Sequence, residues 1–203
     1  MGTCYIVAAG EMNGEIPALR SDDLLIAADA GYMHLKRLNI EPDILLGDFD
    51  SMTVPENKEV IVHPVMKDDT DTMLAIKLGF EKGYKEFVIY GALGGERTDH
   101  TVANIQSLAF IVDNGGSGVL VGDGEMFTIV KNGEIVIAKG ENPMFSVFAY
   151  GGAAEGVTIS GALYNVENIS FSPFIPLGVS NEIKDDKAVV SVKNGCLLII
   201  YNG

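Results

Sequence analysis

Acidic residues follow several apolar segments in the first half of this sequence. Asp48 and Asp50 stand in Gly-Asp-Phe-Asp-Ser just after the apolar residues 44–46, and Asp29 and Asp71 follow two other apolar runs. Carboxylates crowded into one cleft repel each other unless a cation neutralises them. Oxygen ligands without a Cys or His cluster suit Mg²⁺ better than zinc, so these acids predict a Mg²⁺ site.

Two basic residues in the same segments suit a phosphate ligand. Arg97 can bind phosphate oxygens as a fork, and Lys67 can bind them as a point charge. A helix that starts after Thr70 would add backbone amide donors. The predicted ligand is therefore a metal-bound phosphate such as Mg·ATP. The sequence has neither Gly-x-x-x-x-Gly-Lys-[Ser/Thr] nor Gly-x-Gly-x-x-Gly after its first apolar run, so another nucleotide architecture is expected.

Each of these features alone has a plain structural alternative. An Asp-x-Asp pair often lies in a solvated turn, and the acids around Thr70 could simply cap a helix. Arg97 and Asp99 could form a surface ion pair of little energetic value. His34 and His63 have no partner pattern, so both are predicted to be structural. The placement of acidic segments after four successive predicted strands is what favours a functional site.

The first 125 residues alternate between short apolar runs and helical patterns. Helical spacing predicts helices over residues 32–38, 72–82 and 101–113, with Thr70 or Asp68 as the cap of the second helix. This alternation indicates a doubly wound α/β domain, in which ligands bind beyond the carboxyl ends of the strands. Strands are predicted over residues 3–9, 24–28, 44–46, 59–62, 86–90 and 118–121.

The sequence changes in character after about residue 130. Short apolar runs are separated by Gly, Asn and Pro, and no helical period remains. This pattern is typical of a small antiparallel sandwich or barrel. The runs cover residues 134–138, 144–149, 157–160, 169–172, 188–192 and 197–201.

Composition and charge narrow the class of protein. The 203 residues carry a net charge of −14, which disfavours nucleic acid as a partner. No run approaches the roughly 18 apolar residues of a membrane helix, and the first residues lack the basic region of a signal peptide. Cys4 and Cys196 fit no metal or redox spacing and are predicted to be buried, reduced thiols. We therefore expect a cytoplasmic protein without a membrane partner.

Five motifs, in their order along the chain, resemble those of the thiamine pyrophosphokinase family. They span both halves of the sequence, which makes them more specific together than any one alone. The resemblance implies an α/β fold with a Rossmann-like parallel-sheet catalytic domain over residues 1–130 and a small antiparallel β-sandwich domain over residues 131–203. The motifs are Asp29-Ala30-Gly31, Gly47-Asp48-Phe49-Asp50-Ser51, Lys67-Asp68-Asp69-Thr70-Asp71, Arg97-Thr98-Asp99-His100 with Asn104, and Leu177-Gly178-Val179-Ser180-Asn181-Glu182.

The resemblance also implies an activity and roles for individual residues. The reaction would transfer the β,γ-diphosphoryl group of ATP to the hydroxyethyl oxygen of thiamine, giving thiamine diphosphate and AMP. Asp48, Asp50 and Asp71 would hold Mg²⁺ on the triphosphate, and Arg97 would complete the catalytic set. The pocket for ATP would be lined by Asp29, Ser51, Lys67, Thr70, Arg97, Asp99, His100 and Asn104.

The same resemblance implies a thiamine site and an oligomeric state. Ser180 and Asn181 would contact the thiamine pyrimidine. This chain has no Trp, so a Phe or Tyr would supply any aromatic surface against thiamine. The family resemblance further implies a homodimer with each site formed between subunits.

Two other enzyme classes fit parts of the same pattern. A metal-dependent phosphatase of the haloacid dehalogenase type also carries Asp-x-Asp after a strand, but it continues to Asp-x-[Thr/Val], where this chain has Met52. A pterin diphosphokinase would differ only in its acceptor. A non-catalytic nucleotide or vitamin sensor would bind the same ligands without releasing AMP.

Overall fold

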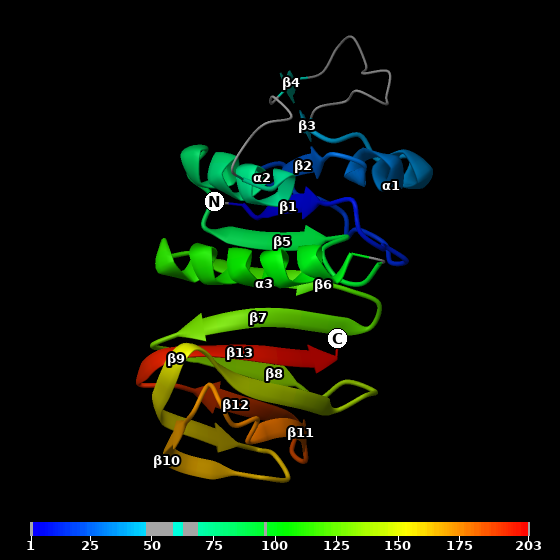
Figure 1. Cartoon of the computed structure of the whole chain (residues 1–203). Helices are drawn as coiled ribbons and strands as arrows, with labels where there is room; N and C mark the ends of the chain where they lie inside the picture. The colour runs from blue at the N-terminus through cyan, green and yellow to red at the C-terminus, as the bar shows by residue number, and fades with distance from the viewer. Residues whose placement is uncertain (1, 48–58, 63–68, 96, 203) are drawn as a thin grey trace. The chain divides into compact units, whose positions relative to one another are not determined.

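The chain is described by a computed structural model that covers residues 2–47, 59–62, 69–95 and 97–202. It has a mixed α/β fold, as the sequence predicts, and divides into two compact units, Met1–Asp123 and Gly124–Gly203 (Figure 1). Among the described residues, no helix is both long and apolar enough to cross a membrane.

The first unit is built on a parallel sheet whose strand order reverses at its centre. Along the sheet the order is β4-β3-β2-β1-β5-β6, and each neighbouring pair is parallel. The reversal lies between β1 and β5, and such a switch point leaves a crevice beyond the carboxyl ends of the strands. The strands are β1 (Cys4–Val7), β2 (Leu24–Ala28), β3 (Ile44–Gly47), β4 (Glu59–Val62), β5 (Glu86–Tyr90) and β6 (Ser117–Val121).

Helices cover both faces of this sheet. Leu35 of α1 (Gly31–Leu38) packs in one core cluster with Val7 of β1. Gly79 of α2 (Asp71–Glu81) lies against the side chains of Cys4 and Phe87. Because side chains alternate along a strand, Cys4 and Val7 point to opposite faces of β1, so α1 and α2 lie on opposite sides.

Helix α2 begins with a side-chain cap and ends before a glycine, as the sequence predicts. Thr70 caps the helix, since its Oγ1 accepts a hydrogen bond from the Met73 amide at 3.2 Å. Gly83, at φ 92°, follows the last turn and donates its amide to the Phe80 carbonyl. The third helix, α3 (Thr98–Asp113), begins three residues earlier than predicted and packs against β6. Its longer start brings Thr98, Asp99 and His100 onto its first turn.

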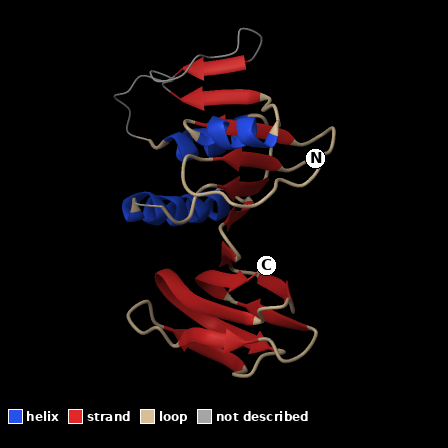
Figure 2. Cartoon of the chain, turned by 90° about the vertical axis from the view of Figure 1, so that its right-hand side faces the viewer, coloured by secondary structure: helices blue, strands red, loops and turns tan. Residues whose placement is uncertain are grey.

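The second unit consists of antiparallel strands arranged around one long strand (Figure 2). The first part of β9 (Met144–Ser160) pairs with β11 and β13, and its last part pairs with β10 and β12. One apolar cluster draws on strands from both groups, including Val147 and Val190. The other strands are β7 (Glu125–Lys131), β8 (Glu134–Ala138), β10 (Val166–Phe171), β11 (Gly178–Glu182), β12 (Lys187–Ser191) and β13 (Asn194–Asn202).

Three features of this unit differ from the strands read in the sequence. The two strands predicted over 144–149 and 157–160 are one strand, because Gly151 and Gly156 bend it at φ 72° and 67° without ending it. The strand β7 was not predicted and pairs along β13. The strand β11 was also missed, since Gly-Val-Ser-Asn-Glu contains few strand-forming residues.

Candidate active site

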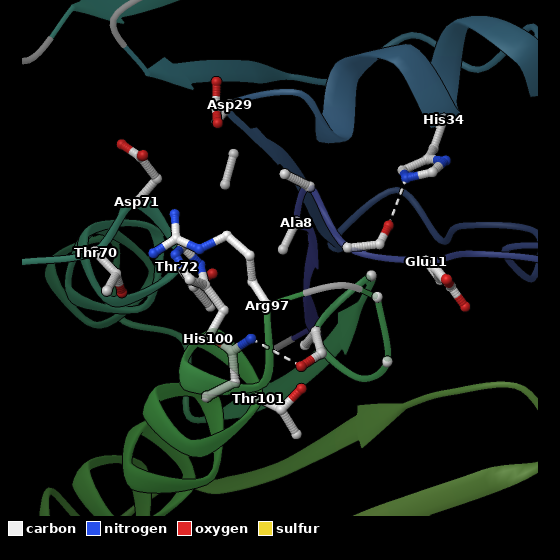
Figure 3. A pocket seen from close by; sticks show the side chains of 18 residues that line it. Ala8, Glu11, Asp29, His34, Thr70, Asp71, Thr72, Arg97, His100 and Thr101 are labelled. Carbon is white, nitrogen blue, oxygen red and sulfur yellow. Dashed lines mark hydrogen bonds between the residues drawn. The ribbon is translucent and has the colours of Figure 1, made fainter.

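A cavity of about 650 Å³ lies in the first unit, at the ends of β1 and β5 where the strand order reverses (Figure 3). Its walls come from the loops after β1, β2 and β5 and from the starts of α2 and α3. This is the crevice in which doubly wound sheets bind their ligands. The lining residues are Ala8, Ala9, Gly10, Glu11, Ala28, Asp29, His34, Thr70, Asp71, Thr72, Gly91, Ala92, Gly94, Gly95, Arg97, His100, Thr101 and Asn104.

The cavity brings together six residues that the sequence analysis proposed for ATP and phosphate. These are Asp29, Thr70, Asp71, Arg97, His100 and Asn104. Asp99 does not line the cavity, but it forms an ion pair with Arg97, which does line it. Four further predicted residues, Asp48, Asp50, Ser51 and Lys67, lie outside the described part of the chain.

Two carboxylates lie at one end of the cavity. Asp29 follows β2 in a left-handed conformation, at φ 53°, and its amide donates to the Leu46 carbonyl at 2.7 Å. Asp tolerates this conformation better than most residues because its short side chain bonds locally. Asp71 is the first residue of α2, next to the capping Thr70. In Figure 3 both acids lie at the same end of the cavity, and Arg97 extends toward them.

Arg97 is held in place by Asp99. Its Nη2 lies 2.7 Å from Asp99 Oδ2 and its Nε lies 3.4 Å from Asp99 Oδ1. This hydrogen bond raises the pKa of Arg97 and lowers the pKa of Asp99. Both side chains are about two-thirds exposed, at 69% and 66%, so solvent screens the pair and its effect on stability is small. The pair orients the guanidinium at the cavity.

The loops after β1 and β5 are in direct backbone contact. The amide of Gly10 donates to the Gly91 carbonyl at 2.8 Å. A Cβ atom on Gly10 would lie 2.5 Å from the Gly91 carbonyl oxygen, and one on Gly91 would lie 2.3 Å from the Ala8 carbonyl oxygen. Gly91 also has φ 62°, so both positions require glycine. The floor of the cavity is therefore made of main chain.

Side chains from two helices fix these loops. The buried Asn104 of α3 donates its Nδ2 to the Ala92 carbonyl at 2.8 Å, so its amide group anchors the loop after β5. His34 of α1 donates its Nε2 to the Gly10 carbonyl at 2.8 Å (Figure 3). A carbonyl can only accept, so this ring nitrogen carries the proton. His34 has the structural role predicted for it, but it performs that role at the cavity wall.

Several cavity residues were missed in the sequence. Glu11, Thr72 and Thr101 line the cavity without belonging to any motif recognised there. Glu11 lies in the loop after β1, which ends at Val7, and Asp29 directly follows β2, which ends at Ala28. The strand-end criterion could have found it, because Glu11 is the first acid after the strand predicted over residues 3–9.

The two predicted thiamine residues lie in the second unit, on β11. Asn181 is buried, and its Oδ1 accepts from the amides of Tyr164 at 3.0 Å and Glu182 at 2.9 Å. Its Nδ2 donates to the Tyr164 carbonyl at 2.9 Å. Ser180 is exposed, with φ 57°, and its amide donates to Ser146 Oγ at 3.1 Å. Asn181 therefore holds the backbone of Tyr164, a residue that is 65% exposed.

The described part of the cavity offers hard oxygen donors for a metal. Its carboxylates are those of Glu11, Asp29 and Asp71, and no cysteine lines it. Within the described ranges, no group of three or more His, Cys, Asp or Glu residues is arranged to hold a metal ion. Mg²⁺ needs only one or two protein carboxylates alongside phosphate oxygens, so this donor set is compatible with Mg²⁺ bound together with a nucleotide.

Comparisons with known proteins agree along the whole chain. Residues 17–116 match the family description "Thiamin pyrophosphokinase, catalytic domain", and residues 132–197 match "Thiamin pyrophosphokinase, vitamin B1 binding domain". A thiamine pyrophosphokinase of Bacillus subtilis (strain 168) is 31% identical over 98% of both chains. A crystal structure of the enzyme from Bacillus subtilis has a TM-score of 0.88 at 29% identity, covering 98% of each chain. A structure from Geobacillus thermodenitrificans has a TM-score of 0.84 at 22% identity, covering 99% of this chain and 97% of that one.

Proposed function

This chain belongs to the thiamine pyrophosphokinase family, and we propose that it transfers the β,γ-diphosphoryl group of ATP to thiamine, giving thiamine diphosphate and AMP. The observation that carries this proposal is the match of a catalytic and a vitamin-binding region in sequence order. The cavity at the strand-order reversal, which gathers acids, Arg97 and glycine-rich backbone, supports it.

We assign the two substrates to different parts of the chain. Residues 1–130 would form a Rossmann-like domain for ATP and Mg²⁺, and residues 131–203 a β-sandwich for thiamine, whereas the two compact units divide at Asp123 and place β7 in the second. The reversed strand order of the parallel sheet supports the first assignment. For the second, support comes from the two groups of antiparallel strands that share β9 and one apolar core.

The acidic end of the cavity is assigned to the metal and the phosphates. Asp71 would hold Mg²⁺ together with Asp48 and Asp50, which lie outside the described residues. When bound, Mg²⁺ would neutralise charge on the triphosphate and draw an anionic substrate into an acidic protein. Asp29 and Thr70 complete this end of the pocket, and the first turn of α2 presents its amides there.

The transfer step depends on position and charge more than on covalent chemistry. The hydroxyethyl oxygen of thiamine forms a bond to the β-phosphorus of ATP, and the bond from that phosphorus to the oxygen on the α-phosphorus breaks. AMP leaves with that oxygen, and the hydroxyl proton passes to an aspartate of the acidic cluster. Arg97, oriented by Asp99, stabilises the charge on the transferring group. His100, with Ser51 and Lys67 from outside the described residues, completes the nucleotide and phosphate pocket.

The thiamine site is assigned to β11 and the turn before β10. Ser180 offers an exposed hydroxyl, and Asn181 uses its amide to hold the backbone of Tyr164. We infer that the ring of the exposed Tyr164 supplies the aromatic surface for the pyrimidine, with Asn181 fixing its position. A rigid aromatic platform of this kind binds flat heterocycles by stacking.

A homodimer is the proposed assembly, with each site formed between subunits. Single exposed apolar residues are normal, but a contiguous set indicates a partner surface. We propose that six exposed apolar residues between residues 163 and 179 form such a set, among which Phe174 is 91% exposed. Its members are Leu163, Tyr164, Phe174, Ile175, Leu177 and Val179. We also propose a cytoplasmic location, where ATP is available.

An acceptor screen tests the proposed activity. Purified protein with Mg²⁺ and ATP receives thiamine, hydroxymethylpterin or no acceptor, and AMP, ADP and phosphate are quantified. We expect AMP and thiamine diphosphate in equal amounts with thiamine alone. AMP formation with the pterin would indicate a pterin diphosphokinase, and phosphate release without an acceptor would indicate a phosphatase. Binding of both substrates without AMP would indicate a sensor.

The same assay tests the metal assignment. Asp71→Asn should lower turnover by about 100-fold or more, because a group that stabilises transition-state charge is removed. Glu81→Gln, an exposed acid at the other end of α2, is the control with the same change of charge. If Asp71→Asn turned over at the rate of the control, the metal role would be excluded.

A further inference from the structure

Glu11 places a carboxylate in the cavity that the proposed reaction does not use. It lines the cavity and is exposed. Within the described ranges of the chain, no hydrogen bond or ion pair reaches this carboxylate. An ionised carboxylate only accepts hydrogen bonds, so a ligand group that binds Glu11 must donate them.

The backbone on both sides of Glu11 is fixed by α1. His34 donates to the carbonyl of Gly10 at 2.8 Å, and Arg37 Nη2 donates to the carbonyl of Met12 at 2.6 Å. The Gly10 amide in turn donates to Gly91 across the cavity floor. Glu11 thus stands between two anchored peptide groups, which fix the backbone from which its side chain extends.

The side chain of Glu11 lies along the glycine pair before Arg97. A Cβ on Gly94 would be 3.4 Å from Glu11 Oε2, and one on Gly95 would be 4.0 Å from its Cγ. The glycines leave the carboxylate reachable from the cavity, since no side chain stands between them. Both residues also have positive φ, 73° and 82°, a conformation that favours glycine.

The position of Glu11 indicates which part of a nucleotide it meets. In Figure 3 it lies across the cavity from Asp29 and Asp71, the proposed end for Mg²⁺ and phosphates. A carboxylate repels phosphate oxygens, so the neutral nucleoside must be the part that reaches Glu11. The vicinal 2′- and 3′-hydroxyls of ribose present two donors to the two oxygens of one carboxylate. The acid that follows a strand in dinucleotide-binding sheets recognises ribose by the same chemistry.

We propose that Glu11 binds the ribose hydroxyls of the nucleotide and selects ribonucleotides over 2′-deoxyribonucleotides. This specificity role rests on the proposed use of ATP by this cavity. Loss of a hydrogen bond to a charged group corresponds to roughly a tenfold or greater loss of affinity. The wild-type protein should therefore bind ATP about tenfold more tightly than 2′-deoxy-ATP.

Calorimetric titration with Mg²⁺ and each nucleotide, in the absence of thiamine, tests this role. Glu11→Ala should weaken ATP binding most and 2′-deoxy-ATP binding less, because 2′-deoxy-ATP loses only the bond from its 3′-hydroxyl, so that the two nucleotides bind with equal affinity. Glu11→Gln, which keeps one acceptor oxygen, should give an intermediate preference. Glu15→Gln is the matched control, because Glu15 is an exposed acid of the same segment that does not line the cavity.

The outcomes separate this role from the proposed reaction. Equal affinity of the wild type for the two nucleotides, or no affinity for either, would overturn the role of Glu11. So would a Glu11→Ala variant that still preferred ATP or lost affinity equally for both. If the preference depended on Glu11 but no thiamine diphosphate formed, the reaction would be wrong and the ribose site would stand.

Discussion

Single side chains at this cavity act on the backbone as much as on a ligand. His34 holds the Gly10 carbonyl from α1, and Asn104 holds the Ala92 carbonyl from α3. The peptide of Gly10 links the two loops through its bond to Gly91. These hydrogen bonds from the helices position the loops that form the cavity walls. Arg97 lies at the end of the loop after β5, so the bond from Asn104 also positions the backbone that leads to Arg97.

His34→Ala tests whether this anchoring matters for nucleotide binding. The substitution removes one hydrogen bond that contributes about 1 kcal/mol to the stability of the fold, and if ATP binding had to restore all of this order its affinity would fall roughly fivefold. We expect KM for ATP to rise by about that factor with little change in kcat, because the wall of the cavity shifts while the reacting groups remain.

His34→Gln is the informative comparison, since its side-chain amide can donate to the same carbonyl. Recovery of most of the wild-type KM is expected for this variant. If Gln failed as badly as Ala, the imidazole itself and not the hydrogen bond would be required. Thermal unfolding of each variant shows whether a change in KM reflects the site or general stability.

At the scale of elements, close packing of helices on the sheet depends on glycine. Gly79 allows α2 to lie against Cys4 and Phe87, and Gly31 allows α1 to begin close to the Val7 carbonyl. Burial raises the pKa of the Cys4 thiol to about 12, so it stays protonated and inert beneath α2. These contacts position the first turns of both helices, where the cavity residues stand.

Gly79→Ala should therefore destabilise the protein. Its Cβ would lie 2.6 Å from Phe87 Cε1 and 3.0 Å from Cys4 Sγ. The Phe87 ring cannot easily yield, because it is buried and packs on Phe80 with ring centroids 4.7 Å apart. Overpacking of this kind costs about 1–3 kcal/mol, which exceeds the gain of at most about 1 kcal/mol from better helix propensity.

Urea unfolding measures this balance. We expect the free energy of unfolding to fall by about 1 kcal/mol or more for Gly79→Ala. Gly14→Ala is a suitable control, since a Cβ at Gly14 meets no atom within 4 Å. A Gly79→Ala protein as stable as the wild type would mean that the sheet beneath α2 can rearrange at little cost.

At the scale of the whole molecule, the proposed dimer follows from the apolar surface of the second unit. Phe174→Asp places a charge within that surface, and burying an unpaired charge is strongly unfavourable. Sedimentation should then change from a species of twice 21.7 kDa to one of 21.7 kDa. Activity should fall with it if the sites lie between subunits.

Val136→Asp controls for the added charge. Val136 is 52% exposed on β8 and does not belong to the apolar set between residues 163 and 179. This variant should keep the mass of the wild type. A wild-type protein that sediments as a monomer at working concentrations would contradict the proposed assembly directly.

Local patterns in the sequence were sufficient to predict much of the secondary structure and several of the cavity residues. Apolar periodicity predicted the alternation of strands and helices in the first unit, and Thr70, one of the two residues predicted to cap α2, caps it. The strand-end criterion brought Asp29, Asp71 and Arg97 to one cavity. These features could be read because helix periods, caps and strand ends depend on neighbouring residues. The motifs that identified the family are equally local.

The tertiary structure decided what depends on distant partners. Which strands are neighbours is a long-range choice, and the pairing of β1 with β5 is what places Glu11 beside Gly94 and Gly95. The amide of Asn181 is committed to Tyr164 by packing across the second unit, and β9 continues through its glycines because both of its ends are paired. Sequence patterns indicate which secondary structure a segment prefers. They do not indicate which distant backbone groups will form hydrogen bonds with that segment. That selection, made by hydrogen bonding and burial between remote segments, gave the cavity its shape.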